Sequence, residues 1–180
     1  KYISKIASYQ SVCFLLLVAL SVNAFSTTGI QMQGYKPPEK VVICGAGVIG
    51  ASVAYYLSLR GTAAVIVDRA GVAKAASGKA GGFLALDWND GSPIGALSRK
   101  SFDLHEELAK TLSLDSYRRL TCSTITLDPS NLGKPSPNKI SEWVDLGARR
   151  TSVLGTRDTV AQVHPRQLTE ALVAAATQRG

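Results

Sequence analysis

Three glycines, Gly45, Gly47 and Gly50, follow a short run of β-branched residues at the spacing Gly-x-Gly-x-x-Gly. This arrangement suits phosphate binding. The first glycine permits a tight turn, the second lets the backbone approach a diphosphate, and the third lets a helix pack closely on the preceding strand. A helix that begins there offers free N–H groups and the positive end of its dipole to the phosphate. Val48 and Ile49 lie inside the motif and belong to the same candidate site.

One acidic residue, Asp68, stands at the end of a second apolar run, residues 63–67. A carboxylate in that place accepts hydrogen bonds from the ribose hydroxyls of an adenine dinucleotide. The same carboxylate would repel the additional phosphate of NADP, so Asp68 disfavours that cofactor. The pattern indicates an adenine dinucleotide without a ribose 2′-phosphate.

A strand, a helix and a second strand must position these residues. Residues 41–44 are predicted to form a fully buried parallel strand, because they are β-branched and apolar and end at a glycine. Residues 51–60 are predicted to be helical, with Gly61 as the stop signal, and residues 63–67 to form the second strand. The order strand, glycine turn, helix, strand and acid is far more specific than the glycines alone. The fold class is therefore α/β, with a Rossmann-like βαβ unit and a parallel sheet.

A second glycine-rich cluster follows Asp68. Its members are Ser77, Gly78, Gly81 and Gly82. The cluster is not a P-loop, because Ala73 stands where that motif needs glycine and Ala80 where it needs a magnesium-binding hydroxyl. It is either a plain loop or a second place where the backbone comes close to a ligand, as glycine permits.

Three sequence stretches, VVICGAGVIGASVAYYL, VIVDR and AASGKAGGF, together resemble the N-terminal half of the FAD-dependent oxidoreductases of the D-amino-acid oxidase type. The stretch from Phe83 is closer to a fungal and plant branch of that superfamily. The resemblance implies FAD bound in extended form, with the turn from Gly45 to Gly50 at the pyrophosphate and Asp68 and Arg69 around the adenosine ribose. It further places four residues along the pyrophosphate, ribityl and flavin side: Ser77, Gly78, Gly81 and Gly82.

The activity implied by this resemblance is oxidation of a small-molecule substrate. A hydride would pass from a C–H bond next to an amine or hydroxyl to the flavin. FAD is favoured over NAD because plain NAD domains lack the second glycine cluster. A non-catalytic dinucleotide-binding module and an NAD-dependent reductase remain the alternatives, and no residue is assigned a catalytic role.

The later part of the chain is expected to begin an antiparallel substrate domain and to return to the nucleotide domain by a helix. Residues 98–112 are predicted to be helical, with His105 packed rather than catalytic. A strand is expected at 123–127, an exposed loop at 128–138 and a short helix at 140–146. The last helix is expected to start at Pro165, which suits a first turn.

The expected segments are a leader at 1–24, a transit-like segment and linker at 25–39, the FAD-binding part at 40–100, and a partial substrate domain with the return helix at 101–180. Family members continue well beyond Gly180, so the resemblance implies an N-terminal fragment or a truncated relative. The apolar run at 12–22 is too short to span a bilayer. With Lys1 and Lys5 before it and small residues after it, this run predicts a secretory signal peptide. The alternative interpretations of this run are a membrane-anchoring helix cut short or a wrongly assigned start of the chain. Onward transport to a plastid and, if the start is wrongly assigned, a cytoplasmic location are the alternatives for the compartment.

Composition excludes several other classes. The 180 residues carry a net charge of +7, with 46% hydrophobic and 18% charged residues, which is ordinary for a globular protein. The basic residues are not interleaved with aromatics, so nucleic-acid binding is not expected. The three cysteines give no disulfide framework, and no ligand spacing supports a metal site. The sequence does not predict the oligomeric state.

Overall fold

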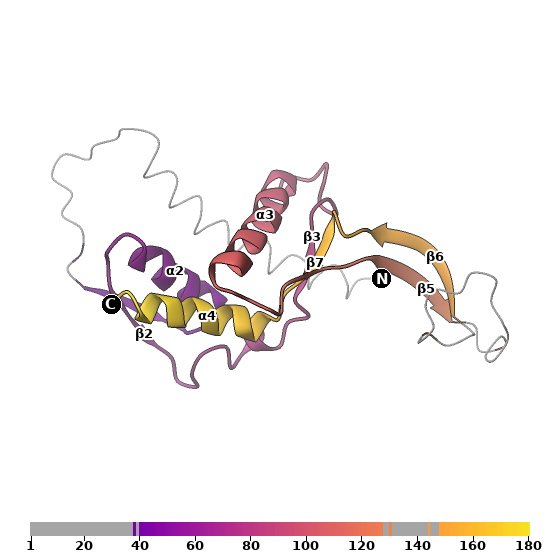
Figure 1. Ribbon diagram of the computed structural model, residues 1–180. Helices are drawn as coiled ribbons and strands as arrows, with labels where there is room; N and C mark the ends of the chain where they lie inside the picture. The colour runs from indigo at the N-terminus through magenta and orange to yellow at the C-terminus, as the bar shows by residue number, and fades with distance from the viewer. Residues whose placement is uncertain (1–37, 39, 128–129, 131–143, 145–147) are drawn as a thin grey trace. The chain divides into compact units, whose positions relative to one another are not determined.

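The computed structural model describes residues 38, 40–127, 130, 144 and 148–180 (Figure 1). These residues form two compact units. One contains the described residues up to Arg118 together with Gln162–Gly180, and the other contains those within Arg119–Ala161. The predicted segments 40–100 and 101–180 divide the chain differently. The predicted leader and the predicted helix at 140–146 fall outside the described residues, apart from single positions, as does most of the predicted loop at 128–138.

The first unit opens with the predicted βαβ arrangement. Strand β1 spans Val41–Cys44, helix α2 spans Val48–Ser58, and strand β2 spans Ala64–Val67. The two strands are parallel and pair in register, from Val41 opposite Ala64 to Cys44 opposite Val67. The α/β class and the parallel pairing are confirmed.

Gly61 ends helix α2 as the sequence predicts. The amide of Thr62 donates to the carbonyl of Leu57 at 3.0 Å, and the amide of Gly61 donates to the carbonyl of Ser58 at 3.0 Å. This pair of bonds requires a left-handed residue after the helix, and Gly61 supplies it with φ of +74°. The short turn delivers the chain directly into β2.

The prediction that β1 is fully buried is wrong for the part of the chain that the structure describes. Val42 is 56% exposed, and Cys44 is also exposed, while Val41 and Ile43 are half-buried. Val65 and Val67 of β2 are exposed in the same alternating way. The reason is that α2 packs on one face of this two-stranded sheet, and no described element packs on the other.

After β2 the chain forms the short helix η1 at Ala76–Gly78 and strand β3 at Phe83–Ala85, and then helix α3 at Gly95–Thr111. Helix α3 begins earlier than predicted because buried Asn89 fixes the loop before it. The Asn89 side chain donates to the Ser98 hydroxyl at 2.8 Å, and that hydroxyl donates to the carbonyl of Ile94. His105 is buried on the inner face of α3, as expected of a packed residue.

Helix α4, Pro165–Thr177, starts at the predicted proline and lies alongside α2 (Figure 1). Leu168, Leu172 and Ala175 are buried and form most of its inner stripe. The guanidinium of Arg179, just past the helix, lies 5.6 Å from the centre of the Tyr55 ring on α2. Packing of α4 against α2 thus encloses the side of the βαβ unit opposite the exposed strand face.

The second unit contains an antiparallel pair, as expected for the beginning of a substrate domain. Strand β5, Cys122–Leu127, pairs with β6, Ala148–Gly155, with two irregularities in the register. Two further short strands, β4 at Arg118–Arg119 and β7 at Val160–Gln162, lie where the chain leaves and re-enters the first unit. They form a three-stranded sheet with β3 in the order β3-β7-β4. Among the described residues no helix has the length and apolar character needed to span a membrane.

Candidate functional site

The glycine turn between β1 and α2 has the geometry that its sequence predicts. Gly45 adopts φ of +109°, a conformation that favours glycine, and its amide donates to the carbonyl of Val67 at 2.7 Å. A side-chain carbon on Gly50 would overlap the carbonyl oxygen of Gly45 and lie 2.9 Å from Cγ2 of Ile43. Gly45 therefore makes the turn, and Gly50 lets the helix start directly against the strand.

The first turn of α2 presents unbonded amides. Among the described residues no acceptor is bonded to the N–H groups of Gly47, Ile49 and Gly50. The carbonyl of Ala46 accepts from the amide of Ala73 at 3.0 Å, and the peptide bonds of the described chain are trans. Because N–H and C=O of a trans peptide point in opposite directions, the Gly47 N–H is directed away from the Ala73 loop. Unbonded N–H groups at a helix N-terminus are the kind of donor set that binds anions.

Ser77 of the second glycine cluster reaches into this turn. Its Oγ accepts a hydrogen bond from the amide of Val48 at 2.9 Å, so Val48 does not offer a bare N–H. This is the one hydrogen bond that Ser77 makes among the described residues, so its hydroxyl proton remains free to donate. An ideal Cβ on Gly47 would lie 3.0 Å from Ser77 Oγ, and glycine at 47 therefore leaves room for the hydroxyl. The structure thus brings Ser77 of the second glycine cluster into contact with the glycine turn.

The carboxylate of Asp68 is hydrogen-bonded by backbone amides. Its Oδ2 accepts from the amide of Ala46 at 2.9 Å, and its Oδ1 accepts from the amides of Ala70 and Gly71 at 2.7 and 2.9 Å. These bonds, that from Ala46 first, lower the pKa of Asp68 below its usual range, and the neighbouring charge of Arg69 adds to the effect. A carboxylate has about four acceptor positions, so Oδ2 can still take one further donor. Asp68 thus fixes the glycine turn and keeps capacity for a ligand.

Two glycines of the second cluster are explained by packing of the chain on itself. A Cβ on Gly78 would overlap the carbonyl oxygen of Ala73, and a Cβ on Gly82 would overlap that of Val163. Gly82 also has φ of +69°. Gly81 differs, because nothing lies within 4 Å of a Cβ there, and it is exposed. Gly78 and Gly82 therefore lie close to the glycine turn, but packing against the backbone is enough to explain why glycine is needed at both positions.

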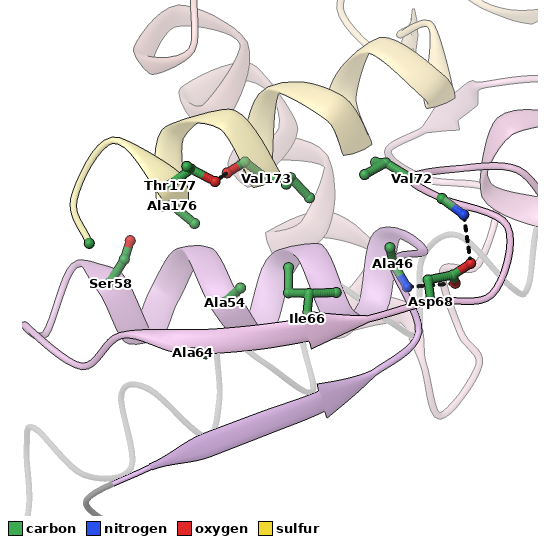
Figure 2. A pocket seen from close by; sticks show the side chains of 12 residues that line it. Ala46, Ala54, Ser58, Ala64, Ile66, Asp68, Val72, Val173, Ala176 and Thr177 are labelled. Carbon is green, nitrogen blue, oxygen red and sulfur yellow. Dashed lines mark hydrogen bonds between the residues drawn. The ribbon is translucent and has the colours of Figure 1, made fainter.

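A cavity of about 410 Å³ adjoins Asp68 (Figure 2). Its walls come from α2, β2, α4 and the loop after Asp68, and they are mostly small side chains. The labelled residues of the figure that line it are Ala46, Ala54, Ser58, Ala64, Ile66, Asp68, Val72, Val173, Ala176 and Thr177. Asp68 is the charged side chain at one end of this cavity, and the Ala46 amide is bonded to it there.

Two residues near the glycine turn, His105 and Arg166, were not predicted as site residues from the sequence. His105 lines a second, smaller cavity beside Ser77, although the helical pattern marked it as a packed residue. Arg166 in the first turn of α4 places Nε 3.4 Å from the ideal Cβ position of Gly78. Both come from segments far along the chain, and no local motif distinguishes them. The described residues contain no cluster of three or more His, Cys, Asp or Glu side chains that could hold a metal ion.

The parallel βαβ unit, the free amides at its glycine turn and the acid after its second strand define a Rossmann-like α/β domain of the dinucleotide-binding class. Comparison with protein families identifies the particular one. The sequence model of the family described as "FAD dependent oxidoreductase" (DAO) matches residues 40–180. The chain therefore belongs to the DAO family of FAD-dependent oxidoreductases.

Two of the curated relatives that the chain matches come from yeasts. "Putative oxidoreductase C1F5.03c" of Schizosaccharomyces pombe is 31% identical over 147 residues, which cover 74% of this chain and 37% of that protein. "Putative oxidoreductase TDA3" of Saccharomyces cerevisiae is 37% identical over 99 residues, covering 50% of this chain and 18% of that protein. These fungal similarities agree with the branch that the sequence resembles. The chain spans about a third of the first relative and less of the second.

A solved structure gives the same fold. Glycine oxidase from Bacillus cereus superimposes with a TM-score of 0.60 over 78% of this chain and 45% of the glycine oxidase chain, at 23% sequence identity. At this identity the comparison shows the fold, which is the predicted FAD-binding architecture.

Proposed function

We propose that this chain binds FAD in an extended conformation and forms the dinucleotide-binding part of an oxidoreductase. In the proposed reaction a C–H bond next to an amine or hydroxyl of a small molecule is broken, and its hydride passes to the flavin. The substrate is thereby oxidised to an imine or a carbonyl compound. When bound, the cofactor supplies this hydride-accepting chemistry, while the chain binds and orients it.

The observation that carries the proposal is the set of free N–H groups at the start of α2. The amides of Gly47, Ile49 and Gly50 have no acceptor within the described residues, and the Ser77 hydroxyl has a proton to donate beside them. Diphosphate oxygens are acceptors and carry negative charge, so they match this set of donors. Val48 would act through Ser77, since its own amide is already bonded to that side chain.

Charge on the neighbouring loop supports the same assignment. Between Asp68 and Asp87 the sequence contains no acidic residue, and it contains three cations, Arg69, Lys74 and Lys79. Positive charge around a diphosphate lowers the energy of the bound anion and increases its local concentration. The loop therefore complements the donors of the turn.

The adenosine end of the cofactor is proposed to lie at Asp68. The remaining acceptor capacity of Oδ2 suits a ribose hydroxyl, and the adjoining cavity of about 410 Å³ has the small apolar walls that accommodate a planar base. Arg69 next to it is exposed and would border the ribose. Gly81, exposed and open, would face the ribityl and flavin side together with Ser77, Gly78 and Gly82.

The proposal is tested by cofactor binding to the purified full chain. We expect bound flavin absorbance after purification, or saturable FAD binding in a titration, and no comparable affinity for NAD. Binding of NAD without FAD would instead identify an NAD-dependent reductase. Binding of neither would remove the dinucleotide assignment, and FAD binding without turnover of any amine or hydroxy acid would favour a non-catalytic module.

A variant of the turn tests the site itself. Gly47→Val fills the approach to the free amides and displaces Ser77 Oγ, which lies 3.0 Å from the ideal Cβ position. The backbone at Gly47, with φ of −79° and ψ of 179°, accepts any residue, so the fold should survive. We expect FAD affinity to be lost, whereas Ala174→Val, at an exposed position of α4, should leave it unchanged. Equal FAD affinity in the two variants would mean that the turn is not the diphosphate site.

The location of the protein remains a prediction from the leader at residues 1–24. We propose entry into the secretory pathway, with onward transport to a plastid and a cytoplasmic location as the alternatives. Localisation of a fluorescent fusion with and without residues 1–24 distinguishes the three.

A further inference from the structure

A second cavity, of about 50 Å³, lies beside the glycine turn. Val48 and Ser77 border it on the side of the turn, Gly82 comes from the second glycine cluster, and Thr169 from α4. His105 of α3 also lines it and is the only titratable side chain among its lining residues. A space of this size is large enough for a small polar group such as a hydroxyl.

The hydrogen bonding of His105 fixes which of its nitrogens carries the proton. Nδ1 lies 2.7 Å from the carbonyl oxygen of Ser101. A carbonyl oxygen only accepts, so Nδ1 must be the N–H donor. Burial of the ring, which is 4% exposed, lowers the pKa of His105 below its ordinary value and so disfavours a second proton on Nε2. The ring is therefore neutral at physiological pH, with an acceptor lone pair on Nε2.

This acceptor has no donor within the described residues. The bond to Ser101 is the hydrogen bond that His105 makes there. Of the two hydroxyls on the cavity wall, that of Thr169 donates to the carbonyl of Pro165 at 2.8 Å, and that of Ser77 accepts from the amide of Val48 and makes no hydrogen bond to His105. Nε2 is therefore available to accept a hydrogen bond from a donor group of a ligand.

We propose that His105 is a positioning residue whose Nε2 accepts a hydrogen bond from a hydroxyl of the ribityl chain of the bound cofactor. This inference rests on the proposed FAD site and names a residue of it that the glycine motifs do not reveal. Phosphate oxygens and flavin carbonyl oxygens have no proton to donate, so an uncharged Nε2 disfavours them. A polyol hydroxyl fits both the chemistry and the size of the cavity, which lies next to Ser77 and Gly82.

The test compares FAD with ADP, which has the diphosphate and adenosine but no ribityl chain. In the full chain, His105→Phe keeps a ring of similar size without an acceptor, and His105→Gln restores an acceptor oxygen. We expect His105→Phe to weaken FAD binding about threefold to tenfold, as the loss of one neutral hydrogen bond does, and to leave ADP binding unchanged. His105→Gln should recover most of the FAD affinity.

A spectroscopic readout is independent of these affinities. The chain has two histidines, His105 and His164, so ¹⁵N-histidine labelling gives a simple spectrum that a His164→Asn variant assigns. We expect the unprotonated nitrogen of His105 to shift on addition of FAD and to stay in place with ADP. FAD binding with an unmoved His105 resonance and unchanged affinity in His105→Phe overturns this inference alone. Failure of the wild-type chain to bind FAD overturns the proposed function.

Discussion

The contact between Gly50 and the glycine turn predicts a large effect of a single methyl group. In Gly50→Ala the new carbon would overlap the carbonyl oxygen of Gly45 and lie 3.2 Å from its carbonyl carbon and 2.9 Å from Ile43 Cγ2. Two of these three contacts are with backbone atoms of the turn, which cannot rotate away. The helix must therefore move off the strand, or the turn must deform.

The expected magnitude follows from two opposing terms. Replacing glycine by alanine inside a helix stabilises it by about 1 kcal/mol when there is room. Forcing an extra carbon into a close-packed contact typically costs about 1–3 kcal/mol, and a backbone obstacle places Gly50 at the upper end of that range. We expect a net loss of about 1–2 kcal/mol in the free energy of unfolding.

Urea denaturation of the full chain measures this loss, read as a lower midpoint with an unchanged slope. Gly81→Ala is the matched control, because no heavy atom lies within 4 Å of its Cβ position and its φ is not in the left-handed region. That variant should stay within about 0.5 kcal/mol of the wild type. If Gly50→Ala were as stable as Gly81→Ala, the proposed close packing of α2 on the turn would be refuted.

Three further predictions concern the end of α3, the buried His105 ring and the two described cysteines. Ser113 follows α3 with φ of +51°, and the next amide, that of Leu114, donates to the Ala109 carbonyl at 2.8 Å. Because glycine adopts this left-handed conformation without strain, Ser113→Gly should raise the free energy of unfolding by about 1 kcal/mol. Equal stability of Ser113→Gly and Ser113→Ala would contradict the left-handed assignment. Burial lowers the pKa of His105 in the folded state, so at a pH below its ordinary pKa of 6.5 the unfolded chain binds more protons, and the free energy of unfolding falls as the pH decreases. Denaturation series at neutral and mildly acidic pH should show a smaller fall for His105→Phe than for the wild type. An unchanged fall would argue that the ring is not buried. In a Cys13→Ser background, Cys44 should react with a thiol reagent faster than Cys122, because Cys44 is exposed while partial burial raises the pKa of the Cys122 thiol. Mapping of the modified cysteines measures the order of reaction. Faster reaction of Cys122 would contradict the exposure of one face of β1.

Local sequence predicted the first part of the fold well, because its signals act over short distances. The β-branched runs, the glycine spacing and the stop at Gly61 each depend on a few neighbouring residues. Strands β1 and β2 lie within one residue of their predicted bounds, and α2 ends before Gly61 as predicted but starts at Val48 instead of Ala51. The start of α3 was less well predicted. It depends on the buried Asn89 side chain and its bond to Ser98, and a sequence pattern does not show which asparagine is buried.

Burial of the sheet was the property that local sequence predicted wrongly. A run such as Val41–Cys44 is apolar on both faces and predicts cover on both. Whether cover is present depends on other elements, and α2 and α4 lie on the same side of the strands that the structure describes. The exposure of Val42 and Val65 therefore reflects which elements accompany the strands and not the strand residues themselves.

The candidate site shows why two motifs were recognised separately although they act together. The glycine turn and the second cluster are joined by Ser77 Oγ on the Val48 amide, a hydrogen bond between residues 29 positions apart. A second long-range pair, Asp68 on the amide of Ala46, anchors the same turn from the end of β2. Each bond removes one amide from direct ligand contact while holding its neighbours in place, so the remaining free donors at Gly47, Ile49 and Gly50 are preorganised and need not be ordered when an anion binds. The glycines keep side chains out of the turn, and Ser77 and Asp68, which lie outside the Gly-x-Gly-x-x-Gly spacing, hold the turn in place.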